Sequence, residues 1–465
     1  MGNPDPAFDE LMVIRGLEPP AEQISMTGAD PILPTRFRLG ESAAAVQLAV
    51  GVAVNDLWEL QHGQRQDLNI EVVHAAATLK SYEYFTEQDE RAAAAWAGRN
   101  GRARISWPHP TRDGRYFLPH MGLPHLAERV LKVLGCSDDL ESVQDAVAAW
   151  DALELEDAIA QVNACGAMVR SQSEWLAHPH GQLMAQKPVI EIIKLADSEP
   201  ESLAAGKRPL SGCRVLDLTR ILAGPTCART LAEHGADVLM VTAEHLPQAE
   251  RFVKDTSHGK RSCFLDLTQA DERLQLQQLI EGADVFSQGY RPGAMQKLGL
   301  SPAQLAEIRP GIIYTSMNCY GYEGPFMNRA GWEQLAQTVT GIAHEQGEDR
   351  PALLPAAACD YTTGYMAAYG TLLALAMRAR TGGSYHVRAS LCQSGMFLQR
   401  QSRVALADQG IGIDRSQLDA VLLESTSGYG PIGFLGPVLG MSETSPHWEL
   451  GSPRLGSGRA EWATA

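Results

Sequence analysis

The feature that most constrains the fold is an alternation of strand-like and helix-like segments across residues 213–317. Five apolar runs have the length and composition of buried strands, at 213–218, 237–242, 262–267, 284–290 and 311–317. Helix-like runs separate them, for example at 223–236 and 275–283. This order predicts an α/β fold, a parallel sheet with helices on both faces. Ligands of such sheets bind beyond the carboxyl ends of the strands, so we look for a site there.

An internal repeat is the second constraint. Residues 51–73 can be laid on residues 370–392 without a gap, at an offset of 319. Both segments read as a helix, a glycine and a strand, and the glycines coincide, Gly51 with Gly370 and Gly63 with Gly382. In the first copy we predict a helix from Glu41 to about residue 60 and a strand over 66–73. The same offset pairs Glu41 with Asp360.

Composition excludes several classes of protein. The 465 residues include 39 Lys and Arg against 55 Asp and Glu, for a formal charge of -16. Nucleic acids and anionic membranes select basic surfaces, so we expect neither as a partner. Eight cysteines form no CxxC pair, and we predict reduced thiols and no metal site. The N-terminus lacks the pattern of a signal peptide and no run of 18 apolar residues occurs, so the predicted location is the cytoplasm.

One acid stands at a distinctive place. Asp360 follows four small residues, Ala356 to Cys359, and precedes a helix-like run. It is either an N-cap, for which Asp is a preferred residue, or a nucleophile, and the two roles are compatible. A carboxylate with an ordinary pKa of about 3.9 is ionised at neutral pH without a general base. Both interpretations stay open on the residues alone.

Several basic residues lie near the ends of the predicted strands. Backbone amides in residues 220–225, at a predicted helix start, suit phosphate oxygens. Positive charge near the strand ends comes from Lys260, Arg261, Arg291 and Lys297. Singly, such residues are most often solvated turn residues, but together they favour an anion site.

Residues 210–399 resemble the family III CoA-transferases, the group that includes formyl-CoA transferase, carnitine CoA-transferase and α-methylacyl-CoA racemase. The resemblance rests on segments that occur in the family's order, 210–241, 258–267, 282–325 and 359–383. Residues 1–200 resemble the later part of the same fold, including its small domain, in segments 56–72, 111–131 and 170–192. This order suggests a permuted chain or a truncated tandem duplication, with segments 1–200, 201–210 (a linker), 211–405 (the CoA-binding core) and 406–465 (a closing segment).

The resemblance implies a doubly wound, Rossmann-like core with a smaller α+β domain. It implies a CoA-transferase that moves CoA between an acyl-CoA thioester and a carboxylic acid through a covalent intermediate on Asp360. Coenzyme A or acyl-CoA is then the co-substrate, without a metal. Family members are interlocked homodimers, so the resemblance also implies a homodimer, unless the permuted order lets one chain supply both parts. The residues it assigns to CoA binding are Arg220, Ile221, Leu222, Ala223, Lys260, Arg261, Leu265, Arg291, Lys297 and Leu298.

The chain also departs from the family. Basic residues that accompany CoA in the family are replaced by Met240, Ala243 and Thr268, and the glycine-rich loop of formyl-CoA transferase is missing. These departures favour an alternative, a non-catalytic CoA-binding or structural paralogue. A third alternative is an acyl-CoA racemase or lyase, but Trp332 and Glu333 stand where the racemases have His and Asp. Glu333 is therefore either a second functional carboxylate or a buried carboxylate that bonds local amides.

Overall fold

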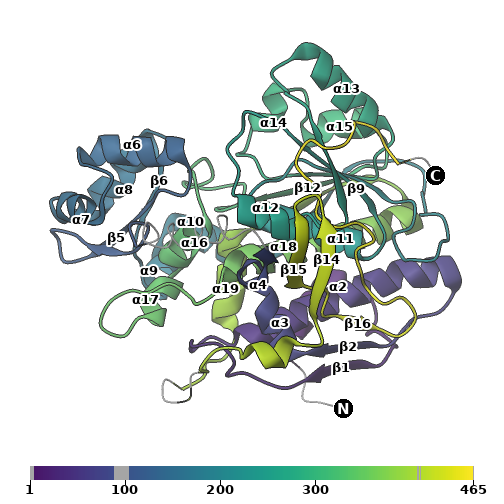
Figure 1. Ribbon diagram of the computed structural model, residues 1–465, viewed down its shortest axis with the longest axis horizontal. Coiled ribbons are helices and arrows are strands. Elements are labelled where there is room, and N and C mark those ends of the chain that lie inside the picture. The colour runs from purple at the N-terminus through teal and green to yellow at the C-terminus, as the bar shows by residue number, and fades with distance from the viewer. Residues whose placement is uncertain (1–4, 88–103, 406–407, 409, 464–465) are drawn as a thin grey trace.

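The computed structural model describes residues 5–87, 104–405, 408 and 410–463, and its centre is a sheet of seven strands (Figure 1). The strand order is β10-β9-β8-β11-β12-β13-β7. All neighbours pair in parallel except β13 and β7, which are antiparallel. The predicted α/β fold with a parallel sheet is confirmed. The strands are β8 (Arg214–Asp217), β9 (Asp237–Thr242), β10 (Lys260–Phe264), β11 (Val285–Gln288), β12 (Ile313–Asn318), β13 (Ser384–Ser390) and β7 (Ile190–Ala196).

Helices cover both faces of this sheet because alternate residues of each strand point to opposite sides. Val215, Val285 and Ile313, which are register neighbours, belong to the core that contains α11 (Ala223–Glu233) and α18 (Ala358–Thr381). The residues that follow them, Leu216, Phe286 and Tyr314, belong to a second core with α13 (Ala270–Glu281) and α15 (Pro302–Ile308). The strands are apolar on both faces because a layer of helices packs against each face.

The internal repeat is present in the structure. Helix α2 (Leu39–His62) and helix α18 each have 24 residues, and both their first and their last residues differ by 319. Each helix ends at a glycine with positive φ, Gly63 at 72° and Gly382 at 68°. A strand and a helix follow in both copies, β2 (Leu68–Glu71) and α3 (Val72–Thr78) in the first, β13 and α19 (Leu391–Arg400) in the second. The predicted strand over 66–73 is therefore shorter than expected, because α3 begins at Val72.

The two copies exchange their last strands. β2 pairs in parallel with β1 (Ile24–Thr27) and antiparallel with β16 (Gly440–Met441), while β13 pairs in parallel with β12 and antiparallel with β7. β7 follows the first copy along the chain and β16 follows the second. Each copy thus takes its antiparallel strand from the segment that follows the other. A Cβ at Gly51 would lie 3.0 Å from Leu68 and 3.1 Å from Leu439, and one at Gly370 would lie 2.7 Å from Val387 and 2.9 Å from Ile190.

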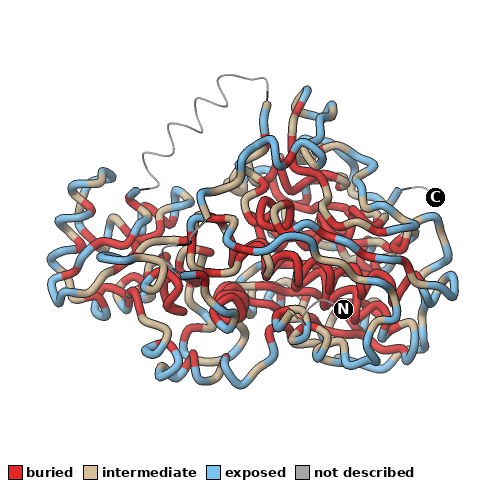
Figure 2. The backbone as a smooth tube through the Cα atoms, turned by 90° about the horizontal axis from the view of Figure 1, so that it is seen from below, coloured by how far each residue is buried: buried red, intermediate tan, exposed pale blue. Residues whose placement is uncertain are grey.

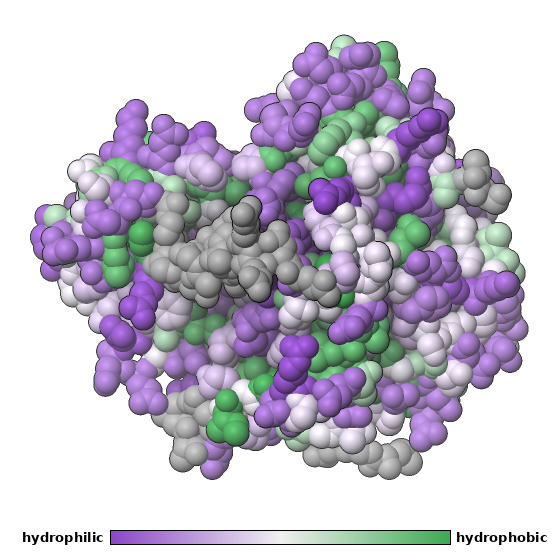
Figure 3. All heavy atoms as spheres, in the orientation of Figure 1, coloured by the Kyte–Doolittle hydropathy of each residue, from purple (hydrophilic) through white to green (hydrophobic). Residues whose placement is uncertain are grey.

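A smaller domain lies to one side of the sheet, at the left of Figure 1. Its antiparallel strands β4 (His109–Pro110), β5 (Tyr116–His120) and β6 (Cys165–Met168) pack with α6 (Pro124–Leu134), α7 (Leu140–Ala148) and α8 (Ala152–Gln161). It has a hydrophobic core of its own, in which Phe117, Val130 and Leu155 are fully buried. Figure 3 shows the hollow between this domain and the lobe that carries α13 and α15.

The remaining elements surround these parts. Residues 197–213 contain no helix or strand and lead from β7 to β8. The other elements are α1 (Pro6–Arg15), α4 (Ser81–Tyr84), β3 (Thr86–Glu87), α9 (Gln172–Ala177), α10 (Pro179–Ala185), α12 (Glu250–Thr256), α14 (Ala294–Lys297), α16 (Glu333–Thr340), α17 (Ile342–Gln346), η2 (Arg415–Leu418), β14 (Leu422–Ser427) and β15 (Gly430–Leu435).

Helix α2 has a length and a mean hydropathy, 1.2 over 18 residues, that would suffice to cross a membrane. No other helix of the described residues does. Within the fold, 89% of that window is buried, and Figure 2 shows the central helices enclosed by the rest of the chain. All eight cysteines are free.

Candidate active site

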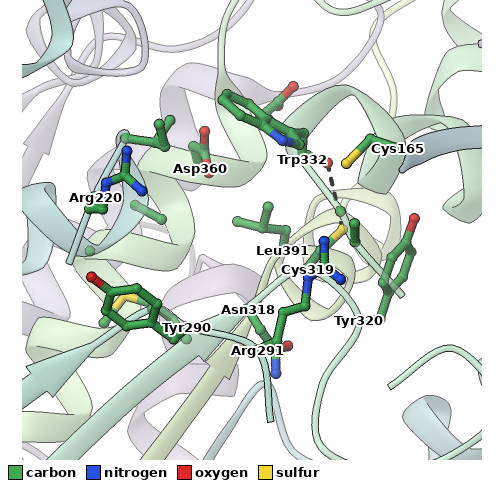
Figure 4. A pocket seen from close by; sticks show the side chains of 18 of the residues that line it. Cys165, Arg220, Tyr290, Arg291, Asn318, Cys319, Tyr320, Trp332, Asp360 and Leu391 are labelled. Carbon is green, nitrogen blue, oxygen red and sulfur yellow. Dashed lines mark hydrogen bonds between the residues drawn. The ribbon is translucent and has the colours of Figure 1, made fainter. Parts of the chain in front are cut away.

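The main candidate site is a cavity of about 270 Å³ at the point where the strand order of the sheet reverses, between β8 and β11. The loops after β8, β11 and β12 line one side of it, through residues 218–224, 289–292 and 317–320. Residues 329–333 and Asp360 line the other (Figure 4). In open α/β sheets this reversal creates a crevice at the carboxyl ends of the strands, which is why the cavity lies there.

The loop after β8 has unusual backbone geometry. Ile221 has a φ of 74°, a left-handed conformation that costs free energy for a β-branched residue. Leu222, the N-cap of α11, gives that helix no side-chain hydrogen bond. A Cβ at Gly224 would lie 2.2 Å from that of Thr219, so only glycine lets this turn close. The strained turn presents the uncapped start of α11 to the cavity, where backbone amides and the helix dipole favour an anion.

Asp360 lies in the first turn of α18 and faces the cavity (Figure 4). The interpretation of Asp360 as an N-cap is wrong. Ala358 and Cys359 already have helical conformation, so the N-cap is Ala357, and it makes no side-chain cap. Asp360 is the third helical residue, and only 8% of its surface is exposed. A carboxylate in the first turn keeps a favourable interaction with the helix dipole without acting as a cap.

Glu333, the first residue of α16, is the second carboxylate of the cavity. Its oxygens accept hydrogen bonds from Nε2 of Gln337 at 2.8 Å and from the backbone N–H of Cys359 at 3.0 Å. The expected bonding to local amides is therefore present, and Glu333 also lines the cavity. It links the start of α16 to the start of α18, which fixes the position of Asp360.

The pKa values of both acids are raised. Burial raises the pKa of Glu333 to about 7. Burial, and secondly the charge of Glu333, raise the pKa of Asp360 well above its ordinary value. Desolvation disfavours the charged form of a carboxylate, so the burial of Asp360 weighs against the expectation that it is ionised without help.

Four basic residues line the cavity, and they differ in their partners. Arg220 donates a hydrogen bond to the carbonyl oxygen of Pro247 and has no carboxylate partner among the described residues. Arg291 donates to the side-chain and main-chain oxygens of Asn163, at 3.1 and 3.2 Å. Arg329 pairs with Glu156 at 3.1 Å and Asp157 at 2.9 Å, and His125 is the fourth.

The pKa of His125 shows that positive charges act on this residue of the cavity lining. Burial, and then the charges of Arg129, Arg220 and Arg291, lower the pKa of His125. The charges of three guanidinium groups therefore act on this residue of the cavity lining. An anionic group of a ligand is the natural counterion for such a cluster.

The structure brings together only part of the predicted site. Seven of the predicted residues line the cavity, namely Arg220, Ile221, Leu222, Ala223, Arg291, Glu333 and Asp360. The other predicted CoA contacts do not. Lys260 is fully buried and pairs with Asp217 at 2.8 Å, and Arg261 pairs with Asp237 at 2.8 Å. Leu265 and Leu298 pack in the second hydrophobic core, and Lys297 is exposed at the end of α14.

The positions that depart from the family also lie outside the cavity lining. Met240 and Ala243 are buried near the end of β9, and exposed Thr268 donates a hydrogen bond to Asp266 at 2.7 Å. Sequence reasoning missed the contribution of the smaller domain, Leu123, His125, Leu126 and Cys165. His125 and Leu126 lie in α6, and Leu123 is the N-cap of that helix. No pattern in a single sequence indicates which face of that helix meets another domain.

Comparison with known proteins identifies the family. Residues 210–420 match the family model described as CoA-transferase family III. The acetyl-coenzyme A transferase nodX of Hypoxylon pulicicidum is 31% identical over 430 residues, which cover 82% of this chain and 72% of that protein. The succinyl-CoA–L-malate CoA-transferase beta subunit of Chloroflexus aurantiacus is 35% identical over 203 residues, 40% of this chain and 50% of that one. Formyl-CoA:oxalate CoA-transferase of Escherichia coli is 31% identical over 215 residues, 43% and 51%.

Among solved structures, the hypothetical protein Rv3272 of Mycobacterium tuberculosis is 31% identical and matches 44% of this chain and 57% of its own, with a TM-score of 0.40. The chain spans only about half the length of most of these curated relatives. The match to nodX, however, extends over most of both chains. The chain belongs to CoA-transferase family III, a family of transferases.

Proposed function

We propose that the protein transfers CoA between an acyl-CoA thioester and a carboxylic acid, with Asp360 as the covalent nucleophile. Family membership supports CoA transfer as the general activity. The observation that carries the role of Asp360 is its position: it is a buried carboxylate that faces the same cavity as the uncapped start of α11.

In this proposal the phosphates of CoA lie at the positively charged end of the cavity. Arg220 has no carboxylate partner among the described residues, and exposed Arg291, which also lines the cavity, donates to the oxygens of Asn163. Amides at the start of α11 supply further donors. Ile221, Leu222 and Ala223 would then contact CoA through the backbone, which explains why a strained turn is kept there.

The first half of the reaction forms and then opens an anhydride. An Oδ atom of ionised Asp360 attacks the thioester carbonyl carbon, the C–S bond breaks, and CoA leaves as its thiolate. The thiolate then attacks the carbonyl carbon of the aspartyl group, which forms an aspartyl–CoA thioester and releases the donor acid as a carboxylate. The energy of the thioester is kept on the enzyme, because each step exchanges one activated acyl group for another.

The second half runs in the opposite sense with a new acid. The acceptor carboxylate attacks the aspartyl–CoA carbonyl carbon, a second anhydride forms, and the CoA thiolate leaves. Attack of that thiolate on the acceptor's acyl carbon gives the new acyl-CoA and restores the carboxylate of Asp360. No proton is gained or lost over the cycle.

Glu333 gives the site a way to ionise Asp360. The charge of Glu333 raises the pKa of Asp360, so protonation of Glu333, whose own pKa is about 7, would favour the ionised form of Asp360. We propose that Glu333 is a positioning and proton-holding residue. Its hydrogen bond from Cys359 also keeps the first turn of α18 in place.

The test is mass spectrometry of the protein after incubation with a panel of acyl-CoAs, followed by hydroxylamine or borohydride. The expected result is a modification that maps to Asp360 and is absent in Asp360→Ala. Asp360→Asn is the closest steric control, because it keeps the shape of the side chain and removes the nucleophile. Adduct formation that persists in both variants would contradict the proposed role.

A non-catalytic CoA-binding or structural protein is the second candidate, and one observation favours it. Met240, Ala243 and Thr268 put no positive charge where the family has basic residues. This candidate predicts no adduct and no turnover, whether or not CoA binds. The same experiment therefore separates it from the transferase. A racemase or lyase activity would exchange or remove the α-proton of an acyl-CoA without an adduct, and proton exchange in deuterated water detects it.

Three further features are proposed with this function. Acyl-CoA is the co-substrate and no metal takes part, so chelators are expected to leave the activity unchanged. A cytoplasmic location is checked by cell fractionation. A homodimer is checked by sedimentation. A monomer would indicate that the exchange of strands β7 and β16 within one chain replaces the interlocking of two chains.

A further inference from the structure

We propose that Gln337 is a positioning residue of the site, which holds the carboxyl group of Glu333 near Asp360 and thereby sets the lower pH limit at which Asp360 reacts. The inference rests on the proposed function, because it assumes that Asp360 is the nucleophile and that the charge of Glu333 controls it. Gln337 is not among the described residues that line the cavity, so it acts only through Glu333.

The side chain of Gln337 contacts Glu333 within one helix. It lies four residues after Glu333 on α16, and only 1% of its surface is exposed. Residues four apart in a helix lie on the same face, so the two side chains meet. The Nε2 atom of Gln337 lies 2.8 Å from each carboxylate oxygen of Glu333. Because both groups are shielded from water, neither has water to replace this contact.

The orientation of the Gln337 amide is fixed from its other side. Its Oε1 atom accepts a hydrogen bond from the backbone N–H of Leu354 at 2.8 Å. The opposite orientation would set two donors against each other at Leu354, so the amide must present its N–H groups to Glu333. Leu354 lies in the segment that leads into α18, before its N-cap Ala357. Gln337 therefore ties Glu333 to the segment that leads to Asp360.

Glu333 receives its hydrogen bonds from neutral groups. The second donor is the backbone N–H of Cys359, at 3.0 Å. Hydrogen bonds of this kind favour the charged form of a carboxylate, whereas burial disfavours it. Burial is the larger effect, and together they leave the pKa of Glu333 raised to about 7. Without the amide of Gln337, the pKa of Glu333 should therefore rise further.

The elements around this part of α16 carry other titratable side chains, namely Cys359 and Asp360 on α18, Tyr82 on α4, His120 on β5, Cys165 on β6 and Cys392 on α19. The segments that meet the other end of α16, near Thr338 and Gly341, carry Arg170, Glu174, His344 and Glu345. Burial lowers the pKa of His120 to about 4, and raises the pKa values of the tyrosine and of the thiols on β6 and α18. We therefore expect Glu333 and Asp360 to titrate beside each other.

The sign of the effect on Asp360 follows from charge. Ionised Glu333 raises the pKa of Asp360. Any change that keeps Glu333 protonated to a higher pH therefore lets Asp360 ionise at a lower pH. Loss of the Gln337 amide is such a change. A residue that only supported the fold would instead alter the reaction by the same factor at every pH.

The first experiment uses Gln337→Met, which keeps the length of the side chain and removes its donor. The rate of adduct formation on Asp360 is measured from pH 5 to 9 with acetyl-CoA, butyryl-CoA and succinyl-CoA as donors. We expect the midpoint of the acid limb to move down by about one pH unit, the size of one lost hydrogen bond. Lower rates at every pH with an unchanged midpoint overturn the inference and leave the proposed function intact.

Gln399→Met is the matched control. Gln399 is also buried, and its Nε2 atom donates to the carbonyl oxygen of Thr340, the last residue of α16, at 3.0 Å. It lies outside the described lining of the cavity, so this variant should keep the wild-type midpoint. An equal shift in Gln399→Met overturns the specific role of Gln337. No adduct on wild-type Asp360 with any donor overturns the proposed function, and the measurement below then tests the contact by itself.

The second experiment needs no turnover. Infrared difference spectra from pH 5 to 9 follow the C=O band of protonated Glu333, which is identified by its absence in Glu333→Gln. The band should disappear near pH 7 in the wild type and about one pH unit higher in Gln337→Met. Should that variant not fold, Gln337→Glu keeps an oxygen for Leu354, and a protonated band should also persist to higher pH because adjacent carboxyl groups resist joint ionisation. A wild-type midpoint in the folded variant overturns the inference.

Discussion

The first turns of α18 and α2 place a carboxylate at the same position of two copies of one scaffold, yet their surroundings differ. Asp360 is buried, lies beside Glu333 and faces a cavity. Glu41, its counterpart 319 residues earlier, is only partly buried and pairs with Arg38 at 2.8 Å. The helix alone therefore does not make a site. The loops after β8, β11 and β12 complete it, because they line the cavity that Asp360 faces.

In both helices, a carboxylate from another segment accepts a hydrogen bond from a backbone N–H of the first turn. The backbone N–H of Glu41 donates to Asp30 at 2.9 Å, much as that of Cys359 donates to Glu333 at 3.0 Å. Burial raises the pKa of Asp30 to about 6 and that of Glu333 to about 7. A buried carboxylate at the start of a long helix is thus a structural feature of both copies. In the second copy, the cavity adds a chemical role to it.

The largest expected difference is in activity. Asp360→Ala should lower CoA transfer by a factor on the order of 10³ or more, as the loss of a nucleophile does in other enzymes. Glu41→Gln should stay within about twofold of the wild type, because Glu41 lies outside the cavity lining. Initial rates of acyl-CoA formation measure both. A comparable loss in Glu41→Gln would mean that the first copy has a site of its own and would contradict the asymmetry.

The next difference is in the pH dependence of stability. The folded pKa of Glu333, about 7, lies above its ordinary value of 4.5, so the folded state holds that proton more tightly than the unfolded state. The contribution is complete below about pH 4.5 and is lost as the pH rises to about 7, a decrease on the order of 3 kcal/mol in the free energy of unfolding. Asp30→Asn should remove a similar decrease that ends near pH 6, where the folded pKa of Asp30 lies.

Urea unfolding at intervals from pH 4.5 to 8 measures these effects as differences from the wild type, since other acids such as Glu233 also have raised pKa values. The stability of Glu333→Gln relative to the wild type should increase up to about pH 7. The stability of Asp30→Asn relative to the wild type should increase only up to about pH 6. A difference that does not vary with pH would contradict the burial of these acids.

The features that were predicted correctly are those that a local or repeated pattern of the sequence determines. Alternating apolar runs predicted the parallel strands, and the 319-residue offset predicted two helices whose ends prove to match residue for residue. Asp360 was found because a charged residue between small residues and an apolar helix is uncommon. The position of Asp360 inside the helix was not predicted, because no sequence pattern shows that Ala358 and Cys359 are already helical.

The rest depends on contacts between distant segments. Lys260 was assigned to CoA for its charge, but Asp217 lies 43 residues away in sequence and 2.8 Å away in space. The raised pKa values of Asp360 and Glu333 follow from burial, which is a property of the assembled fold. The exchange of β7 and β16 depends on which of two similar sheets each strand joins, and composition does not encode that choice.

The smallest expected difference is in packing, at the glycines where each long helix crosses its own sheet. A Cβ at Gly370 would lie 2.7 Å from Val387 and 2.9 Å from Ile190, whereas a Cβ at Gly51 would lie 3.0 Å from Leu68 and 3.1 Å from Leu439. Overpacking costs about 1–3 kcal/mol, while replacement of a helical glycine by alanine gains about 1 kcal/mol in helix propensity. Gly370→Ala should therefore destabilise the fold by about 1–2 kcal/mol, and Gly51→Ala should be close to neutral.

The midpoint of urea unfolding checks the order of these two values. We attribute the difference to the closer contacts at Gly370 and to the size of the sheets: β13 and the edge strand β7 belong to a sheet of seven strands, whereas β2 and β16 belong to a sheet of three. Gly51→Ala as costly as Gly370→Ala would mean that the smaller sheet is as rigid as the larger one. The two copies would then differ only in their loops, and the loops alone would account for the single cavity beside Asp360.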